Sequence, residues 1–120
     1  MLAKANRLRQ RADILKTTQS GQRINSGSLT GFFLKVDNND QPKFGYIVSR
    51  RIGGSVDRHR VTRQLRHLSY PWVGKLPKTT YLVIRPNTKI EKYESDFNKL
   101  LEKIILKSNG SKEVIEKVLF

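Results

Sequence analysis

The sequence has no cysteine, and it has only one methionine and one tryptophan among its 120 residues. Without cysteine the chain can form neither a disulfide nor a thiolate metal site, which fits a reducing compartment. No apolar run is long enough to cross a bilayer, and the start, MLAKANRLRQR, lacks the apolar stretch of a secretory signal. We therefore expect a cytoplasmic protein.

Acidic residues are scarce, because 10 Asp and Glu stand against 24 Lys and Arg, which gives a net charge of +14. Residues 1–70 carry 14 basic and 4 acidic side chains, mostly arginine among the basic ones, whereas residues 71–120 carry 10 and 6, mostly lysine. The planar guanidinium of arginine pairs with phosphate at two points and stacks on bases. This charge pattern favours a nucleic-acid partner over a membrane or an acidic protein.

Apolar residues are nevertheless sufficient for a folded protein, since 37% of the chain is hydrophobic and 8% is aromatic. The length suits a single domain, 1–120, with one modest core. Residues 1–12 are basic, and we expect them to form an extended, flexible N-terminus.

The first half of the chain contains one weak helix signal and two strand signals. Aromatic and aliphatic residues cluster at 29–36 and 43–51, and the turn DNNDQP between these strands predicts an antiparallel hairpin. Before them we expect a short helix at 12–19 and a Gly-, Ser- and Asn-rich loop at 20–28.

The second half begins with a break, IGG at 52–54, after which Ser55 or Asp57 can cap a helix that ends near Leu68. A loop at 69–78 and a strand at 79–86 follow. Thr88 and Glu91 match a capping box for a helix at 89–108, and Asn109-Gly110 predicts its end. The last expected element is a short helix at 112–119, capped by Ser111, with Val114, Ile115, Val118 and Leu119 buried. The order α-β-β-α-β-α-α predicts an α+β fold, a small α/β sandwich.

The helix at 57–68 has two chemically different faces. At 100° per residue, Val61, Leu65 and Leu68 fall on one side and are expected to face the sheet. Asp57 is the only acid between residues 41 and 90, whereas an ordinary solvated helix alternates charges of opposite sign. An unneutralised basic face can lie along a phosphate backbone and release its counterions. The residues outside the apolar side are Arg58 near its border, His59, Arg60, Arg63, Arg66 and His67.

The segment PKFGYIVSRRIGGSVDRHRVTRQLRHL (42–68) resembles the signature of the bacterial ribonuclease P protein component. That family has a strand ending in Ser and two basic residues, a Gly-containing loop, and a helix with an Arg-Asn-Arg core, a Lys-Arg pair and a further Arg. NRLRQRADI (6–14) is similar to the family's opening, and TTYLVIRP (79–86) to its last strand. The corresponding places hold Ser49-Arg50-Arg51, Gly53-Gly54, Arg58-His59-Arg60, Thr62-Arg63 and Arg66.

The resemblance implies the order α-β-β-β-α-β-α, a ribosomal protein S5 domain 2-like fold with a left-handed β-α-β crossover. It also implies an accessory subunit of a ribozyme, in which the RNA removes the 5′ leader of precursor tRNA with bound Mg²⁺. We therefore expect ribonuclease P RNA and precursor tRNA as partners. We expect no DNA or membrane partner, no catalytic residue, and no metal or other cofactor bound by the chain itself. A protein oligomer is not implied.

The resemblance also predicts two sets of contact residues. The leader is expected in a groove between the N-terminal helix and the sheet, where aromatic rings can stack on any base. Only one of Phe32 and Phe33 can point outward, because neighbours on a strand alternate. The expected contacts with the catalytic RNA are Arg50, Arg51, Arg58, His59, Arg60, Thr62, Arg63 and Arg66. The expected contacts with the leader are Arg9, Arg11, Phe32, Phe33 and Tyr46.

The chain departs from the family pattern at four positions. His59 replaces the usual Asn, and Thr62 replaces a Lys and so lacks a charge that attracts phosphate. Ile14 and Thr18 stand where the family commonly has aromatic residues associated with the leader groove.

Candidate catalytic residues have simpler interpretations. Asp37 and Asp40 belong to a turn, and the acids at 91–96 suit a helix start. His59 and His67 are eight residues apart among arginines, which disfavours a bound cation. We therefore expect no intrinsic catalysis.

The alternative to a ribonuclease P subunit is a ribosomal protein or another structural RNA-binding protein. A DNA-binding regulator is less favoured because strands flank the basic helix.

Overall fold

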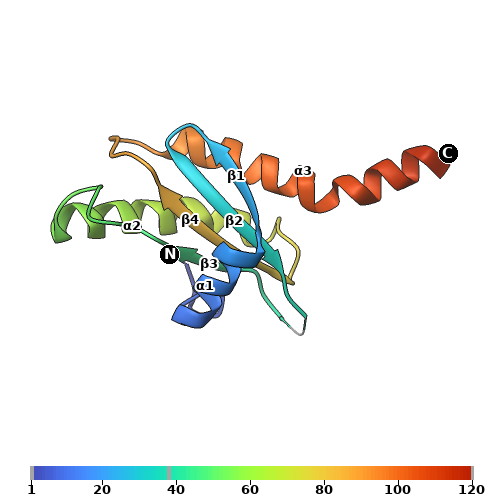
Figure 1. The fold of residues 1–120 in the computed structure, drawn as a ribbon, viewed down its shortest axis with the longest axis horizontal. Helices are drawn as coiled ribbons and strands as arrows, with labels where there is room; N and C mark the ends of the chain where they lie inside the picture. The colour runs from blue at the N-terminus through green and yellow to red at the C-terminus, as the bar shows by residue number, and fades with distance from the viewer. Residues whose placement is uncertain (1, 38, 120) are drawn as a thin grey trace.

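A computed structural model describes the backbone of residues 2–37 and 39–119, and the side chains of these residues up to 107. A four-stranded mixed sheet carries helices on both faces (Figure 1), so the chain has the predicted α+β fold. The elements in chain order are η1 Lys4–Asn6, α1 Arg11–Ser20, β1 Gln22–Ser26, β2 Leu29–Lys35, β3 Lys43–Tyr46, α2 Ser55–Ser69, η2 Tyr70–Trp72, β4 Thr80–Pro86 and α3 Glu94–Leu119.

The strands are ordered β1-β2-β4-β3. β2 pairs antiparallel with both β1 and β4, whereas β3 pairs parallel with β4. The predicted hairpin between 29–36 and 43–51 is therefore wrong, because β4 lies between these two strands. Leu82, Val83 and Ile84 are all fully buried, and a strand that is apolar on both faces is most stable in the middle of a sheet.

β1 occupies a segment that the sequence predicted to be a loop. Its residues are mostly polar, and only Ile24 brings a large apolar side chain to the core. An edge strand can be held by its backbone hydrogen bonds alone. β1 pairs with β2 in this way, from Gln22 opposite Phe33 to Ser26 opposite Leu29. Gly27 has a φ of 55° and makes the tight turn into β2. With β1 included, the order is α-β-β-β-α-β-α.

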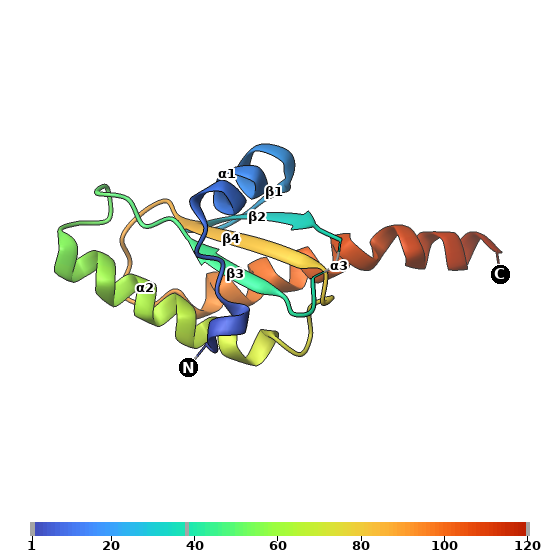
Figure 2. The ribbon, with the colours of Figure 1, turned by 90° about the horizontal axis from the view of Figure 1, so that it is seen from below.

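The sheet separates two helical layers (Figure 2). α1 lies on one face, where Leu8, Phe32 and Val83 form a small buried cluster with Ile14 packed against it. α2 and α3 cover the other face and bury the main core. As predicted, Val61 and Leu65 of α2 are buried in it and Leu68 packs against it. The predicted apolar face of α3 is also in the core, with four residues fully buried and the fifth packed against them: Phe97, Leu100, Leu101, Ile104 and Ile105.

The helix ends differ from the predicted caps. The N-cap of α2 is Gly54, without a side-chain hydrogen bond, and Asp57 in the first turn instead forms an ion pair of 3.2 Å with Lys89. The predicted capping box of Thr88 and Glu91 is wrong, because α3 begins at Glu94.

A buried tyrosine organises the chain before α3. The Tyr93 hydroxyl donates to the Thr88 carbonyl (2.9 Å) and accepts from the Ile90 N–H (3.2 Å). α3 continues past Asn109-Gly110, so the predicted separate helix at 112–119 is part of it. The predicted burial of Val114, Ile115, Val118 and Leu119 lies outside the described side chains.

The N-terminal segment packs against the protein instead of extending from it. Leu2 and Leu8 are only 1% and 5% exposed, and residues 4–6 form the short helix η1. The Leu8 N–H donates to the Phe44 carbonyl (2.8 Å), and Arg7 makes a parallel bridge with Phe44. The segment thus covers the free edge of β3, with its two leucines as anchors.

Candidate nucleic-acid interface

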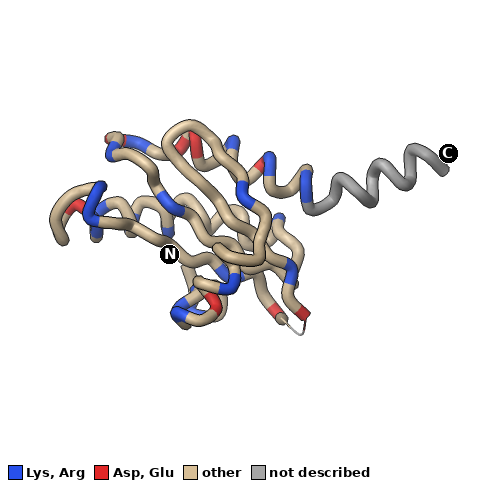
Figure 3. The backbone as a smooth tube through the Cα atoms, in the orientation of Figure 1, with Lys and Arg blue, Asp and Glu red and all other residues tan. Residues whose placement is uncertain are grey.

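α2 presents its basic side chains away from the core, as its sequence pattern predicted. His59, Arg60 and Arg63 are exposed, while Arg58 and Arg66 are half-buried at the border toward β3. Figure 3 shows basic positions along α2, in the loop before it and around α1, with few acidic positions among them. The exposed basic face and its neighbouring loop form one positive surface.

A groove runs between α2 and β3. It consists of two adjoining cavities of about 480 and 340 Å³, and both are lined by Tyr46, Thr62 and Arg66. We call them together the α2–β3 groove. No acidic residue lines either cavity. The five arginines that line the groove are Arg7, Arg9, Arg58, Arg63 and Arg66.

Arg58 has an unsatisfied donor beside this groove. Its Nε atom is buried and makes no hydrogen bond within the described residues. A buried N–H without an acceptor is unfavourable, and a phosphate oxygen supplies a strong, charge-assisted acceptor. Thr62 is no substitute for the lysine of the family pattern, because its hydroxyl donates to the Arg58 carbonyl at 2.8 Å.

Tyr46 forms a wall of the groove and is anchored beneath it. Its hydroxyl lies 2.7 Å from Ser69 Oγ, and Ser69 Oγ donates to the Leu65 carbonyl, so the tyrosine is the donor of the pair. Burial raises the pKa of Tyr46 well above its usual value, against smaller opposing effects of the Ser69 hydrogen bond and of Arg66 and Arg7. The phenol is therefore neutral and fixed in place.

The two neighbouring phenylalanines of β2 point to opposite faces of the sheet. Phe32 is on the α1 face, 6% exposed, and its ring centroid lies 5.3 Å from the Arg85 guanidinium and 6.0 Å from that of Arg23. Phe33 is 9% exposed and belongs to the main core under α2 and α3. Phe33 is therefore not on the face where the leader groove was predicted, because strand alternation turns it to the other side.

The remaining predicted contact residues are accessible. Arg9 lines the α2–β3 groove, and Arg11 is exposed at the start of α1. Arg50 and Arg51 are exposed in the loop before α2, next to the buried Ile52. Gly53 has a φ of 146°, and a Cβ there would lie 2.6 Å from the Asp57 carboxylate, so this position of the loop requires glycine.

Three arginines near the predicted contacts were not singled out from the sequence. Arg7 lines the groove because the N-terminal segment packs beside β3, which no local pattern indicates. Arg23 and Arg85 reach Phe32 from the strands on either side of β2. No local pattern marked these two arginines, because Ile24 is the only large apolar residue of β1, which was interpreted as a loop, and Arg85 directly follows a continuous apolar run at 82–84.

The described residues contain no group of three or more His, Asp or Glu side chains placed to hold a metal ion. Asp37 and Asp40 lie in the turn after β2, and Asp40 is exposed. Within the same part of the chain, no helix combines the length and the apolarity that a bilayer span needs.

Comparisons with known proteins agree with this geometry. A family model described as Ribonuclease P matches residues 2–107. The chain is similar to the ribonuclease P protein component of Thermobifida fusca (39% identity over 92 residues, covering 71% of this chain and 63% of the relative). It is also similar to that of Rhodococcus erythropolis (37% identity over 92 residues, covering 71% and 73%). The chain thus spans a little less than two thirds of the Thermobifida relative.

Solved structures show the same fold. The ribonuclease P protein of Thermotoga maritima superposes with a TM-score of 0.62 at 26% identity, covering 82% of this chain and 91% of that one. The protein of Staphylococcus aureus superposes with a TM-score of 0.63 at 17% identity, covering 87% and 94%. The second comparison supports the fold alone.

Proposed function

The chain belongs to the ribonuclease P protein family, and on that premise we propose that it assists a catalytic RNA in removing the 5′ leader of precursor tRNA. The observation that carries this proposal is the α2–β3 groove, which five arginines line without any acid. Such a groove attracts RNA of any sequence, because the phosphate backbone of the RNA supplies most of the binding energy for a basic protein.

We assign the contacts of the catalytic RNA to α2 and the loop before it. The exposed row of His59, Arg60 and Arg63 can follow a phosphate backbone along the helix. At the border of this row, the orphan Nε of Arg58 would gain its missing acceptor from the RNA. Arg50, Arg51, Thr62 and Arg66 complete this contact set.

We assign the leader to the α1 side of the sheet. Arg9 and Arg11 lie at the entry to α1, and Phe32 lies under Arg85 and Arg23 on the same face. Because Phe32 is 6% exposed, the arginines above it would make the first contact with a nucleotide. Ile14 packs into the cluster beneath α1, so the aromatic contact of other family members at that position is replaced by a core contact.

Catalysis in this proposal belongs to the RNA subunit with its bound Mg²⁺, and the chain supplies binding and orientation. The partners are ribonuclease P RNA and precursor tRNA, and the place of action is the cytoplasm. The alternative of a ribosomal protein is not favoured, since the family model and the curated relatives all belong to ribonuclease P.

Reconstitution tests the proposal directly. The protein is mixed with a bacterial ribonuclease P RNA and precursor tRNA at low Mg²⁺, and we expect faster leader cleavage than with RNA alone. The double variant Arg60→Ala with Arg63→Ala should bind the catalytic RNA about tenfold more weakly, with a shallower dependence of affinity on salt.

The matched control is Lys99→Ala with Lys107→Ala, which removes the same charge from exposed positions on α3. It should retain nearly all of the affinity. No increase in leader cleavage, or equal losses in the two double variants, would contradict the proposed function.

A further inference from the structure

A cavity of about 550 Å³ lies just beyond the C-terminal end of α2, away from the α2–β3 groove. It opens between the end of α2, the short helix η2 and the first half of α3. Its size is within the range of cavities that hold small organic groups. The lining residues are His67, Leu68, Pro71, Trp72, Lys75, Glu94, Asn98 and Glu102.

The cavity continues the basic outer face of α2. His67 lines it and is exposed on the same side of the helix as Arg60 and Arg63. Directly after the helix, Tyr70 is 59% exposed, and Trp72 follows at the cavity wall. An RNA strand that lies along α2 would therefore reach two aromatic side chains where the helix ends.

Trp72 is held in a fixed orientation. Its indole N–H donates to Asn98 Oδ1 at 3.2 Å, and its ring packs partly against the main core. The same hydrogen bond fixes the amide of Asn98, whose nitrogen is then available to an acceptor in the cavity. A preorganised ring loses little conformational freedom when a ligand stacks on it.

In the free protein, the ammonium group of Lys75 lies over the Trp72 ring. Its nitrogen lies 4.7 Å from the ring centroid in a cation–π contact. At accessible sites this contact is weaker than the stacking of a nucleobase on an aromatic ring. A base can therefore displace Lys75 from the ring.

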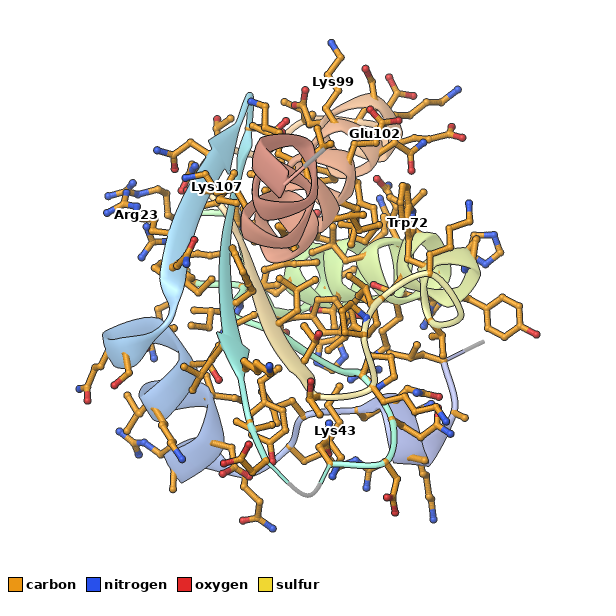
Figure 4. The ribbon with its side chains drawn as sticks, turned by 90° about the vertical axis from the view of Figure 1, so that its right-hand side faces the viewer. Arg23, Lys43, Trp72, Lys99, Glu102 and Lys107 are labelled. Carbon is orange, nitrogen blue, oxygen red and sulfur yellow. The ribbon has the colours of Figure 1, made fainter. Side chains whose placement is uncertain are left out.

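Two carboxylates determine which part of a nucleotide the cavity accepts. Glu94 and Glu102 line the wall formed by α3, and the one ion pair among the described residues joins Asp57 and Lys89 instead. In Figure 4, Trp72 and Glu102 lie on one flank of α3, while Arg23 and Lys107 lie on the other. Unpaired carboxylates repel phosphate but accept hydrogen bonds from the amino groups of bases.

We propose that this cavity binds one unpaired, amino-bearing base of the catalytic RNA, stacked on Trp72 with its amino group toward Glu94 or Glu102. The inference deepens the proposed function and rests on it, because it extends the RNA contact of α2 beyond the helix. It adds a base-reading position to a surface that otherwise contacts phosphates. The catalytic RNA is the occupant because the cavity adjoins α2 and is on the helix layer opposite α1.

The first test uses the unmodified protein, in which Trp72 is the only tryptophan. Titration with a bacterial ribonuclease P RNA should quench its fluorescence, with half-saturation at the Kd measured independently by filter binding. Precursor tRNA alone should quench it only at a clearly higher concentration, because it lacks the α2 contact of the catalytic RNA. An unchanged signal with the catalytic RNA, or equal quenching by precursor tRNA alone, would overturn the inference.

The second test uses variants and labelled catalytic RNA. Trp72→Leu should weaken binding about tenfold, because one stacked base is lost, while the salt dependence stays the same because no phosphate contact is removed. Trp72→Phe keeps an aromatic face and should restore most of the affinity. Affinity of the Leu variant within twofold of the unmodified protein would argue against the stacked base.

These outcomes separate the inference from the proposed function. If the Arg60 and Arg63 double variant binds weakly but Trp72→Leu binds normally, α2 contacts the RNA and the cavity does not.

A third comparison tests the amino group of the base. Oligocytidylate should quench Trp72 fluorescence at lower concentration than oligouridylate, and the double variant Glu94→Gln with Glu102→Gln should reduce that difference. Equal quenching by both oligonucleotides would refute the role of the carboxylates.

Discussion

Asp96 joins the start of α3 to the turn between β1 and β2. Its carboxylate accepts from the Ser28 hydroxyl (2.6 Å) and from the Ser28 N–H (3.0 Å), and these hydrogen bonds lower the pKa of Asp96. Gly27, in the same turn, has no room for a side chain, because a Cβ would collide with the Asp96 carboxylate. One ionised side chain thus fixes a turn and a helix start together.

The lowered pKa predicts a pH dependence of stability. The folded protein favours the ionised carboxyl, so the contribution of Asp96 is complete above its unfolded pKa of about 4 and is lost as the pH falls through the folded value. Asp96→Asn should lower the Tm at pH 7, and the difference from the unmodified protein should shrink toward pH 2. Thermal unfolding followed by circular dichroism measures both curves, and a difference that is constant with pH would contradict the role of the charge.

Among the elements, the N-terminal segment has a structural role that its sequence did not indicate. Leu8 is buried against Phe32 and Val83, and its backbone pairs with the edge of β3. The segment therefore closes one edge of the sheet and at the same time brings Arg7 and Arg9 to the α2–β3 groove.

Two leucines give a matched test of this role. Leu8→Ala should reduce the free energy of unfolding by about 2–5 kcal/mol, because a fully packed side chain is replaced by a cavity. Leu15→Ala, in α1 at a position that is 45% exposed, should change it by less than about 0.5 kcal/mol. Denaturant unfolding measures both variants, and equal values would mean that the segment does not contribute to the folded core.

α2 was predictable because its apolar spacing and its single acid among many arginines are both local properties of the sequence. β1 was not, because Ile24 is its only large apolar residue in the core and its pairing depends on β2. The position of β3 was missed for a related reason, since a short turn suggested a hairpin while the burial of β4 on both faces decides the order. The cavity at Trp72 depends on α3, which approaches only in the folded chain.

At the scale of the whole molecule, the net charge of +14 is the dominant property. Only one ion pair is formed among the described residues, so most of the positive charge is uncompensated and opposes the compact state. In the proposed complex, phosphates of the RNA would relieve this repulsion, so RNA binding would also stabilise the fold.

Anions should therefore stabilise the isolated protein. We expect the Tm to rise by about 5 °C or more when sulfate is added, since 1 kcal/mol corresponds to about 4–8 °C in a small domain. Chloride at equal ionic strength should have a smaller effect, because it lacks the multiple acceptor oxygens of sulfate. Differential scanning calorimetry in the two salts is the measurement, and identical Tm values without added salt and with either salt would contradict this expectation.

The central position of β4 in the sheet also affects how the chain folds during its synthesis. β2 and β3 have no partner on their inner edges until residues 80–86 have left the ribosome. Most of the chain must therefore be synthesised before the sheet can close, and its longest-range pairs form last. Until then the nascent chain exposes two strand edges and an arginine-rich helix without its core. The sheet of this protein can thus close only after β4 has emerged.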